Sequence, residues 1–374
     1  MSVVVAPDKF AGSLTAPQVA DAVAQGWRSV RPGDRVGCLP MSDGGPGFID
    51  ALAASLPGTA VRVGVRDPLG GPVTAECLVV DGSWYVESAQ AAGLALVPPA
   101  RRDPGRVTTR GVGELLAAAV AADARTIVVG LGGSATNDGG AGLLAALGAV
   151  ATDSAGAPVP LDEGPAGFGR IARLEVSAPL RLLAGRELIV ATDVDNPLYG
   201  PDGASRMFAG QKGATRAEID ELDAALRHWA QICAEAGVPR ELASARGAGA
   251  AGGLGFALLA LGGECRSGID LVVAATGAAA RFRDADLVIT GEGSFDAQSL
   301  HGKVVMGVVR AAGSTPVVVV AGRSDLAPAV VRAAGIRQVL TAAERAPSID
   351  DAIARGAFYV TEMGRQLALE VSAC

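Results

Sequence analysis

Both ends of the chain alternate short apolar runs with amphipathic stretches. Close to the N-terminus, an apolar run at 3–6 is followed by a loop, a helical period over 16–27 and a second apolar run at 36–39. The same alternation returns near the C-terminus, where the predicted strands and helices are, in order, 287–290, a helix after 303, 317–321, 327–334, 338–340 and 349–367. Apolar runs separated by amphipathic helices are typical of βαβ units, so both ends predict α/β structure with parallel strands.

The middle of the chain has a different pattern. Short strands with alternating polar and apolar residues are predicted at 60–65, 73–80 and 84–87, and turn sequences rich in Asp, Pro and Gly join them. This is the pattern of an antiparallel meander. Helices dominate after it, interrupted by predicted strands at 126–129 and 187–191.

The simplest arrangement of these elements is an α/β fold with two domains. Residues 1–69 plus 285–374 would form a parallel-sheet domain built from both chain ends, and residues 70–284 would form an inserted mixed α/β domain. Ligands of open α/β sheets bind at the carboxyl ends of strands and at domain interfaces. The active site is therefore expected in the cleft between the two domains.

Composition narrows the class of protein. Apolar residues make up 49% of the 374 residues and mean hydropathy is +0.34, yet the longest apolar runs are far shorter than the roughly 20 residues that a membrane span needs. The N-terminus has neither a basic region nor a cleavage motif, which predicts a soluble cytoplasmic enzyme with no membrane partner. The net charge of −7 argues against a nucleic-acid partner, and the five scattered cysteines have no metal-ligand spacing.

Rare residue types point to a few segments. Of the 32 lysines and arginines only three are lysines, and the chain has two asparagines and two histidines. His228 lies on a helical stretch and is interpreted as ordinary helix surface. The remaining rare residues all fall in loops rich in glycine or aspartate: Lys9, Asn137, Asn196, Lys212, His301 and Lys303.

A glycine-rich loop follows the predicted strand 126–129 and opens a helix at 141–147. Its sequence, at 130–140, is GLGGSATNDGG. A strand feeding such a loop aims backbone N–H groups at an anion. Gly132 and Gly133 would permit close approach, and further donors would come from Ser134, Thr136 and Asn137. The alternative is a tight turn with local caps, but eleven residues so rich in glycine are costly to order, which favours a binding function.

Several enzyme classes are excluded or disfavoured by the motifs. The chain contains no GxxxxGK[ST] sequence, so it is not an ordinary P-loop NTPase. A GxGxxA match at 130–135 lacks the later acidic residue of dinucleotide sites, and a GxGxxG match at 247–252 follows no predicted strand. Neither a GxSxG hydrolase elbow nor a His or Cys metal cluster is present.

Acidic residues gather after predicted strands. Asp43 precedes two glycines, Asp193 and Asp195 follow the strand 187–191, and Glu292 and Asp296 follow the strand 287–290. Each alone would be interpreted as a turn or cap carboxylate. Together with the rare lysines they indicate Mg²⁺–phosphate chemistry, because Mg²⁺ is bound through one or two carboxylates, waters and phosphate oxygens.

The lysines fit the complementary role in phosphoryl transfer, which needs cations placed around the γ-phosphate. Lys9 and Lys303 are the first candidates. Lys212 would serve equally or be a solvated turn residue. His301 would act as an acid or base near neutral pH or only hold its loop by hydrogen bonds, and the sequence does not separate these alternatives.

Taken together, these segments resemble the bacterial glycerate kinase family. The matching stretches run in order from residue 3 to about 322: APDKFAGSLTA, MSDGGPG, GLGGSATNDGGAG, DVDNPLYGPDGAS, QKGA, GAGAAGGLG and DADLVITGEGSFDAQSLHGK. The resemblance implies a flavodoxin-like domain with an inserted α/β domain. It implies transfer of the γ-phosphoryl of ATP to D-glycerate with Mg²⁺, and 2-phosphoglycerate as the product.

The motifs and the family resemblance together predict catalytic roles for Lys9, Asp193, Asp296 and Lys303. Metal ligands would come from Asp193, Asp195 and Asp296. The substrate- or nucleotide-binding residues would be Gly132, Gly133, Ser134, Thr136, Asn137, Asp43, Glu292, His301 and Lys212. A monomer or a homodimer is expected.

Three positions depart from the family pattern. Ala11 stands where many relatives carry a second Lys, Pro46 where they carry Glu, and Ser294 where Arg or a similar residue is common. A kinase of another small hydroxy acid is therefore an alternative. From other classes, the sequence leaves a nucleotide- or dinucleotide-binding oxidoreductase and a silent phosphometabolite-binding protein.

Overall fold

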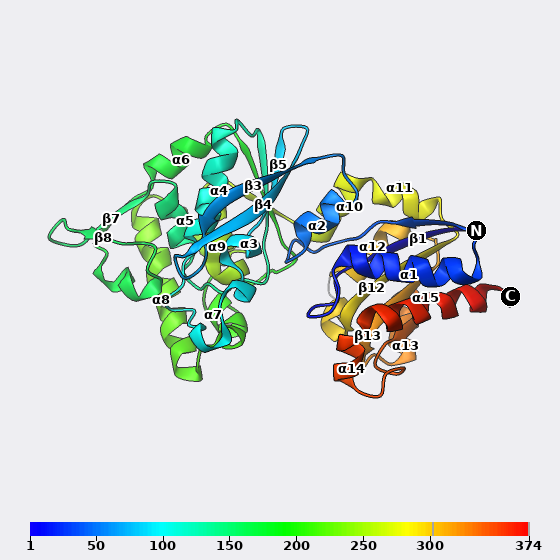
Figure 1. Ribbon diagram of the computed structural model, residues 1–374. Coiled ribbons are helices and arrows are strands. Elements are labelled where there is room, and N and C mark those ends of the chain that lie inside the picture. The colour runs from blue at the N-terminus through cyan, green and yellow to red at the C-terminus, as the bar shows by residue number, and fades with distance from the viewer. Residues whose placement is uncertain (301–302, 373–374) are drawn as a thin grey trace. The chain divides into compact units, whose positions relative to one another are not determined.

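The computed structural model describes residues 1–300 and 303–372 and confirms an α/β fold (Figure 1). The chain divides into two compact units. Unit 1 comprises Met1–Asp43, Asp50–Pro57 and Ser267–Cys374, and unit 2 comprises Gly44–Ile49 and Gly58–Arg266.

Unit 1 is built on a parallel sheet with the strand order β14-β13-β12-β1-β2. In chain order its strands are β1 (Ser2–Pro7), β2 (Arg35–Cys38), β12 (Leu287–Phe295), β13 (Val317–Ser324) and β14 (Ile336–Thr341). The central strands are buried on both faces, as continuous runs of valine and isoleucine require. The predicted βαβ pattern at both chain ends is therefore confirmed.

Helices cover both faces of this sheet. On one face, α1 (Ala16–Val30) and α15 (Gly356–Ser372) share a core with Val5, Ile289 and Val320. In Figure 1 these two helices, blue and red, lie side by side. They approach closely through glycine, since a Cβ on Gly26 would lie 1.9 Å from the carbonyl oxygen of Thr361. On the other face α12 (Val304–Ala312) and α13 (Pro328–Ala333) pack against Val319 and Ala321.

The order of strands in unit 1 reverses between β1 and β12. From β1 the chain moves outward to β2, whereas from β12 it moves the opposite way through β13 to β14. Such a switch point leaves a crevice outside the carboxyl ends of the two strands, where open α/β sheets bind ligands.

Unit 2 contains a six-stranded mixed sheet with the order β11-β10-β6-β5-β4-β3. Its strands are β3 (Thr59–Arg66), β4 (Pro72–Val80), β5 (Ser83–Glu87), β6 (Thr126–Gly130), β10 (Glu187–Ala191) and β11 (Glu264–Arg266). β3, β4 and β5 form the predicted antiparallel meander, and the remaining neighbours pair in parallel. A separate small sheet has the order β8-β7-β9, from β7 (Val150–Thr152), β8 (Pro158–Val159) and β9 (Arg173–Glu175).

The other helices complete the two units. In unit 1 they are α10 (Gly268–Thr276), α11 (Ala278–Arg283) and α14 (Ile349–Ala354), with most of α2 (Phe48–Ala53). In unit 2 they are α3 (Ala89–Ala92), α4 (Arg110–Ala121), α5 (Ala141–Ala146), α6 (Ser177–Leu183), α7 (Ala204–Phe208), α8 (Arg216–Glu235) and α9 (Ala250–Ala260).

The boundaries of the units differ from the predicted domain boundaries at 69 and 285. β3 lies in unit 2 because all of its residues pair with β4. The helices α10 and α11 lie in unit 1 because they pack against α12. The unit to which β3, α10 and α11 belong is thus decided by the elements they pack against, and the local sequence does not reveal these partners.

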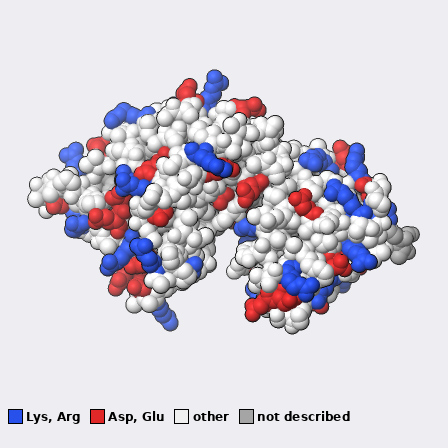
Figure 2. Space-filling model, in the orientation of Figure 1, with Lys and Arg blue, Asp and Glu red and all other residues white. Residues whose placement is uncertain are grey.

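Among the described residues, no helix is both long enough and apolar enough to cross a membrane. On the face of the molecule drawn in Figure 2, lysine and arginine side chains are interspersed with aspartate and glutamate.

Candidate functional site

A cavity of about 520 Å³ opens at the carboxyl ends of the strands of unit 1. The loops after β1 and β2, the end of β12 and the start of α12 supply its charged lining: Asp8, Lys9, Asp43, Glu292, Asp296 and Lys303. The structure therefore brings five of the predicted site residues together with Asp8. This position coincides with the switch point between β1 and β12.

Asp8 is the centre of the charged lining. Its Oδ1 accepts a hydrogen bond from the backbone N–H of Lys9 at 2.7 Å, and the Nζ of Lys9 lies 3.6 Å from the same oxygen. The Nζ also lies 4.0 Å from Oδ1 of Asp43. Burial raises the pKa of Asp8 to about 7, against the favourable charge of Lys9.

Glu292 lies at the end of β12 and is also buried. Burial, together with the nearby charges of Asp8 and Asp296, raises the pKa of its carboxyl to about 7, against the opposing effects of a hydrogen bond with Ser299 and the charge of Lys303. Within the described residues, Oε1 of Glu292 has no hydrogen-bond partner. A buried carboxylate oxygen without a partner is energetically costly unless a ligand or cation contacts it.

Asp296 and Lys303 flank the short 3₁₀ turn η6 (Ala297–Leu300). Oδ1 of Asp296 accepts hydrogen bonds from the backbone N–H groups of Gln298 (2.9 Å) and Ser299 (3.3 Å), so the local turn fixes this carboxylate. Lys303 is the N-cap residue of α12. His301 lies outside the described residues.

Ser294 and Arg323 form a cross-strand pair beside the cavity. They are register partners in β12 and β13, and Nε of Arg323 donates to Oγ of Ser294 at 3.1 Å. Both residues line the cavity. An arginine on the neighbouring strand therefore stands next to the position where Ser294 departs from the family pattern.

The other predicted binding residues lie in unit 2, where Lys212 is almost fully buried beneath the glycine-rich loop. Its Nζ donates to Oγ of Ser134 at 2.9 Å and to the carbonyl oxygen of Thr136 at 2.7 Å. Burial lowers the pKa of Lys212 to about 7, partly offset by the charge of Asp138. The alternative interpretation of Lys212 as a solvated turn residue is wrong, because the side chain is 3% exposed.

Asn137 is fully buried in the same loop. Its Nδ2 donates to Oγ of Ser205 at 2.9 Å, and within the described residues its Oδ1 has no hydrogen-bond partner. The close approach that Gly132 and Gly133 permit is to the chain itself. A Cβ on Gly132 would lie 2.7 Å from Cα of Gly45, and one on Gly133 would lie 2.4 Å from Cγ of Pro46.

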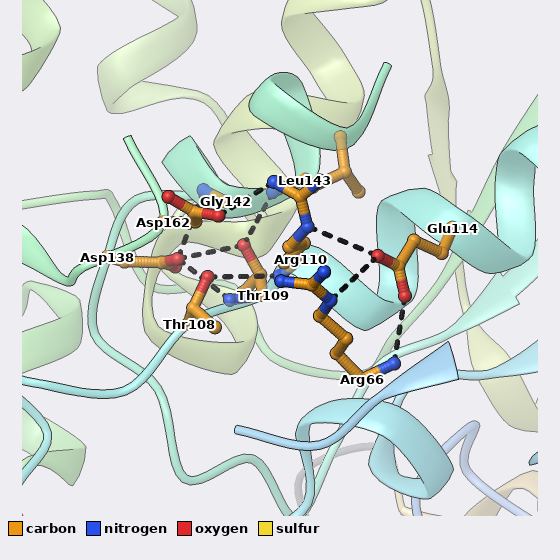
Figure 3. A network of polar contacts seen from close by, with 9 residues as sticks. All are labelled: Arg66, Thr108, Thr109, Arg110, Glu114, Asp138, Gly142, Leu143 and Asp162. Carbon is orange, nitrogen blue, oxygen red and sulfur yellow. Dashed lines mark hydrogen bonds and ion pairs between the residues drawn. The ribbon is translucent and has the colours of Figure 1, made fainter. Parts of the chain in front are cut away.

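A buried carboxylate within the glycine-rich loop, that of Asp138, ties the loop to the elements beside it (Figure 3). Oδ2 of Asp138 accepts hydrogen bonds from the N–H and Oγ1 of Thr109, at 2.8 and 2.9 Å, and from the N–H of Gly142 at 3.2 Å. Its Oδ1 accepts from the N–H of Gly140 at 3.1 Å. Oγ1 of Thr109 in turn accepts from the N–H of Leu143, so α4 and the start of α5 are tied to the loop.

Asp193 and Asp195 lie after β10 in unit 2, and their surroundings differ. Asp195 is exposed and forms an ion pair with Arg246. Asp193 is half-buried; the hydrogen bond and charge of Asp195 raise the pKa of Arg246, and the charge of Asp193 adds to this effect. Among the described residues, no three His, Cys, Asp or Glu side chains gather closely enough to form a metal site by themselves.

Sequence reasoning missed three residues that the structure makes prominent. These are Asp8 and Arg323 in the cavity and Asp138 within the glycine-rich loop. Asp8 comes directly after a strand, between Pro7 and Lys9. A position directly after a strand is the signal that identified the other carboxylates, so it could have identified Asp8 as well. Arg323 is one of many arginines, and its proximity to Ser294 depends on strand register alone.

Comparison with known proteins gives a consistent result. The model of the glycerate kinase family matches residues 3–372. A glycerate kinase of Bacillus subtilis (strain 168) is 41% identical over 99% of this chain and 98% of its own length. A glycerate 2-kinase of Escherichia coli (strain K12) is 41% identical over 96% of this chain and 94% of its own. A crystal structure described as glycerate kinase 2 from Salmonella typhimurium LT2 superposes with a TM-score of 0.82 at 39% identity, covering 100% of this chain and 98% of that one.

Proposed function

The chain belongs to the glycerate kinase family and is therefore a kinase, and on this basis we propose that it transfers the γ-phosphoryl group of ATP to D-glycerate. The proposed product is 2-phosphoglycerate, which the name of the Escherichia coli relative supports. The other hydroxy acids considered from the sequence are outcomes that the experiment below separates.

One observation carries this proposal: carboxylates and lysines converge in a single cavity at the switch point of the parallel sheet. Phosphoryl transfer requires cations near the γ-phosphate oxygens and a group that positions or deprotonates the attacking hydroxyl. Lys9 and Lys303 supply the positive charge. The carboxylates of the same lining are the groups that would position the attacking hydroxyl.

The charged lining also fits Mg²⁺. Its donors are carboxylate oxygens, the ligands that Mg²⁺ prefers, and the buried Oε1 of Glu292 has no partner among the described residues. One or two of the unit 1 carboxylates of Asp8, Glu292 and Asp296 would hold the ion together with phosphate oxygens. When bound, Mg²⁺ neutralises charge on the phosphate oxygens. The ion pair between Asp195 and Arg246 makes Asp195 a weaker metal ligand than was predicted.

The product distinguishes the proposed reaction from its alternatives. We expect ADP to form when the protein is incubated with Mg-ATP and D-glycerate, and not in excess EDTA. Enolase added alone should then yield phosphoenolpyruvate. A need for added phosphoglycerate mutase would mean that the 3-hydroxyl is attacked, and ADP formation only with another acid would change the substrate.

Asp8 is expected to lower stability at alkaline pH. Its pKa is raised in the folded state, so the folded protein holds the proton between about pH 4 and pH 7, where the unfolded chain has lost it. The free energy of unfolding of the parent should therefore fall as pH rises through this range. Asp8→Asn removes the dependence and should be more stable than the parent at pH 8, by on the order of 1–2 kcal/mol.

Urea unfolding at pH 8 and pH 5 measures this difference, which should shrink at the lower pH. Asp325→Asn, at an exposed loop position in the same unit, is the matched control and should show little change at either pH. An Asp8→Asn variant that is less stable than the parent at pH 8 would mean that the Asp8 carboxylate stabilises the folded state.

A further inference from the structure

The cavity in unit 1 is lined by apolar residues as well as by the charged residues described above; we refer to these two parts as its apolar and its charged end. We call the apolar end the apolar wall. It consists of Phe10, Ala342, Ile349, Ala352, Ile353 and Val360. These residues come from the loop after β1, the segment after β14, and the helices α14 and α15.

Two isoleucines of the apolar wall are unusually exposed. Ile349 is 57% and Ile353 is 47% exposed, and their spacing of four residues puts them on one face of α14. Both line the cavity. Aliphatic surface left in contact with water favours any partner that covers it with an apolar surface of its own.

The apolar wall is fixed relative to the charged end. Oγ of Ser13, in the loop that carries Asp8 and Lys9, donates to the carbonyl oxygen of Ile353 at 2.8 Å. At the start of α15, Gly356 allows this contact, because a Cβ there would lie 2.2 Å from Oγ of Ser13. The distance between the apolar wall and the charged end is thus fixed for a ligand that contacts both.

Resting on the proposed ATP-dependent reaction, we propose that the apolar wall binds the purine ring of the nucleotide, while the charged end holds its phosphates. D-Glycerate and a triphosphate chain have no apolar surface to place on aliphatic side chains, whereas a purine has two flat apolar faces. The cavity volume of about 520 Å³ lies within the range of pockets for ligands of nucleotide size, and it far exceeds the need of a three-carbon acid.

The test compares a nucleotide with a ligand that has its phosphates but no base. We would measure the dissociation constants of ADP and of pyrophosphate by calorimetry for the parent and for the double variant Ile349→Ser/Ile353→Ser. The double variant should bind ADP about tenfold more weakly, because the purine would no longer cover the roughly half-exposed side chains of two isoleucines. Its affinity for pyrophosphate should stay within about twofold. The KM for D-glycerate should not change.

Val330→Ser is the matched control. Val330 is 40% exposed on α13 of the same unit and does not line the cavity, so its variant should bind both ligands like the parent. Because all three side chains are already about half exposed, the variants should melt nearly like the parent.

Unchanged ADP affinity in the double variant would overturn the proposal, as would equal weakening of ADP and pyrophosphate. A raised KM for D-glycerate with normal ADP binding would assign the apolar wall to the acceptor instead. A parent that binds no adenine nucleotide at all would overturn the proposed function itself, and this outcome is distinct from the others.

Discussion

Lys303→Met, Asp296→Asn and Asp193→Asn are each expected to lower kcat by about 10²-fold or more, with a smaller change in KM. Lys303 and Asp296 line the cavity of unit 1, and Asp193 follows a parallel strand in unit 2. Charge spreads over the γ-phosphate oxygens only as transfer proceeds, so a group that stabilises this charge acts mainly in the transition state.

The substitutions preserve size, and the side chains are only partly buried, so folding should be little affected. Two surface variants of unit 1 serve as controls for the same chemical changes: Asp325→Asn for the carboxylates and Arg310→Met for the cation. Arg310 forms an exposed ion pair with Asp270, and such pairs contribute little to stability.

A structural role predicts the opposite result, which is a lowered melting temperature and nearly normal turnover in the protein that remains folded. If all three variants melt like the parent and keep kcat within about threefold, a difference of less than ~1 kcal/mol in the barrier, the assignment of these residues is wrong. The reacting group would then have to be sought around Asp8, Lys9 and Glu292.

Elements with a clear hydrophobic period were predicted correctly from the sequence. The buried valine runs of β1 and β13 and the alternating residues of β3 and β4 indicate their strand types without any tertiary information. In the same way, the carboxyl end of a predicted parallel strand pointed to Glu292 and Asp296, because such strand ends share one edge of a sheet.

What the sequence lacked was information about packing partners. The residues next to Lys212 in the sequence do not show whether its side chain is solvated or buried. Its hydrogen bond with Ser134 joins residues that lie 78 positions apart in the sequence. The break inside α9 is another example. Ala251, with a φ of 52°, adopts a left-handed conformation that alanine rarely takes, next to two glycines that also have positive φ. There the backbone of Gly252 packs against Thr136, a contact that no local pattern signals.

Asp138→Ala should lower the free energy of unfolding by about 3 kcal/mol or more. The side chain is fully buried, and its two oxygens accept four hydrogen bonds, three of them from backbone N–H groups. Burial raises the pKa of this carboxyl, while these donors lower it. Alanine would leave the donors of Thr109, Gly140 and Gly142 buried without an acceptor, and water has no access to replace it.

Asp153→Ala is the matched control, because Oδ1 of Asp153 also accepts two backbone hydrogen bonds, from Ala155 and Ala157, but at an exposed turn. Water can satisfy those donors, so this variant should lose less than about 1 kcal/mol. Thr109→Val keeps the shape but removes one donor to Asp138 and the acceptor for Leu143, so it should fall between the two. Urea unfolding of the four proteins gives this order directly. Equal stabilities of the Asp138→Ala and Asp153→Ala variants would show that the glycine-rich loop keeps its conformation without the buried carboxylate, and Lys212, through Ser134 and Thr136, would then be the residue that holds it.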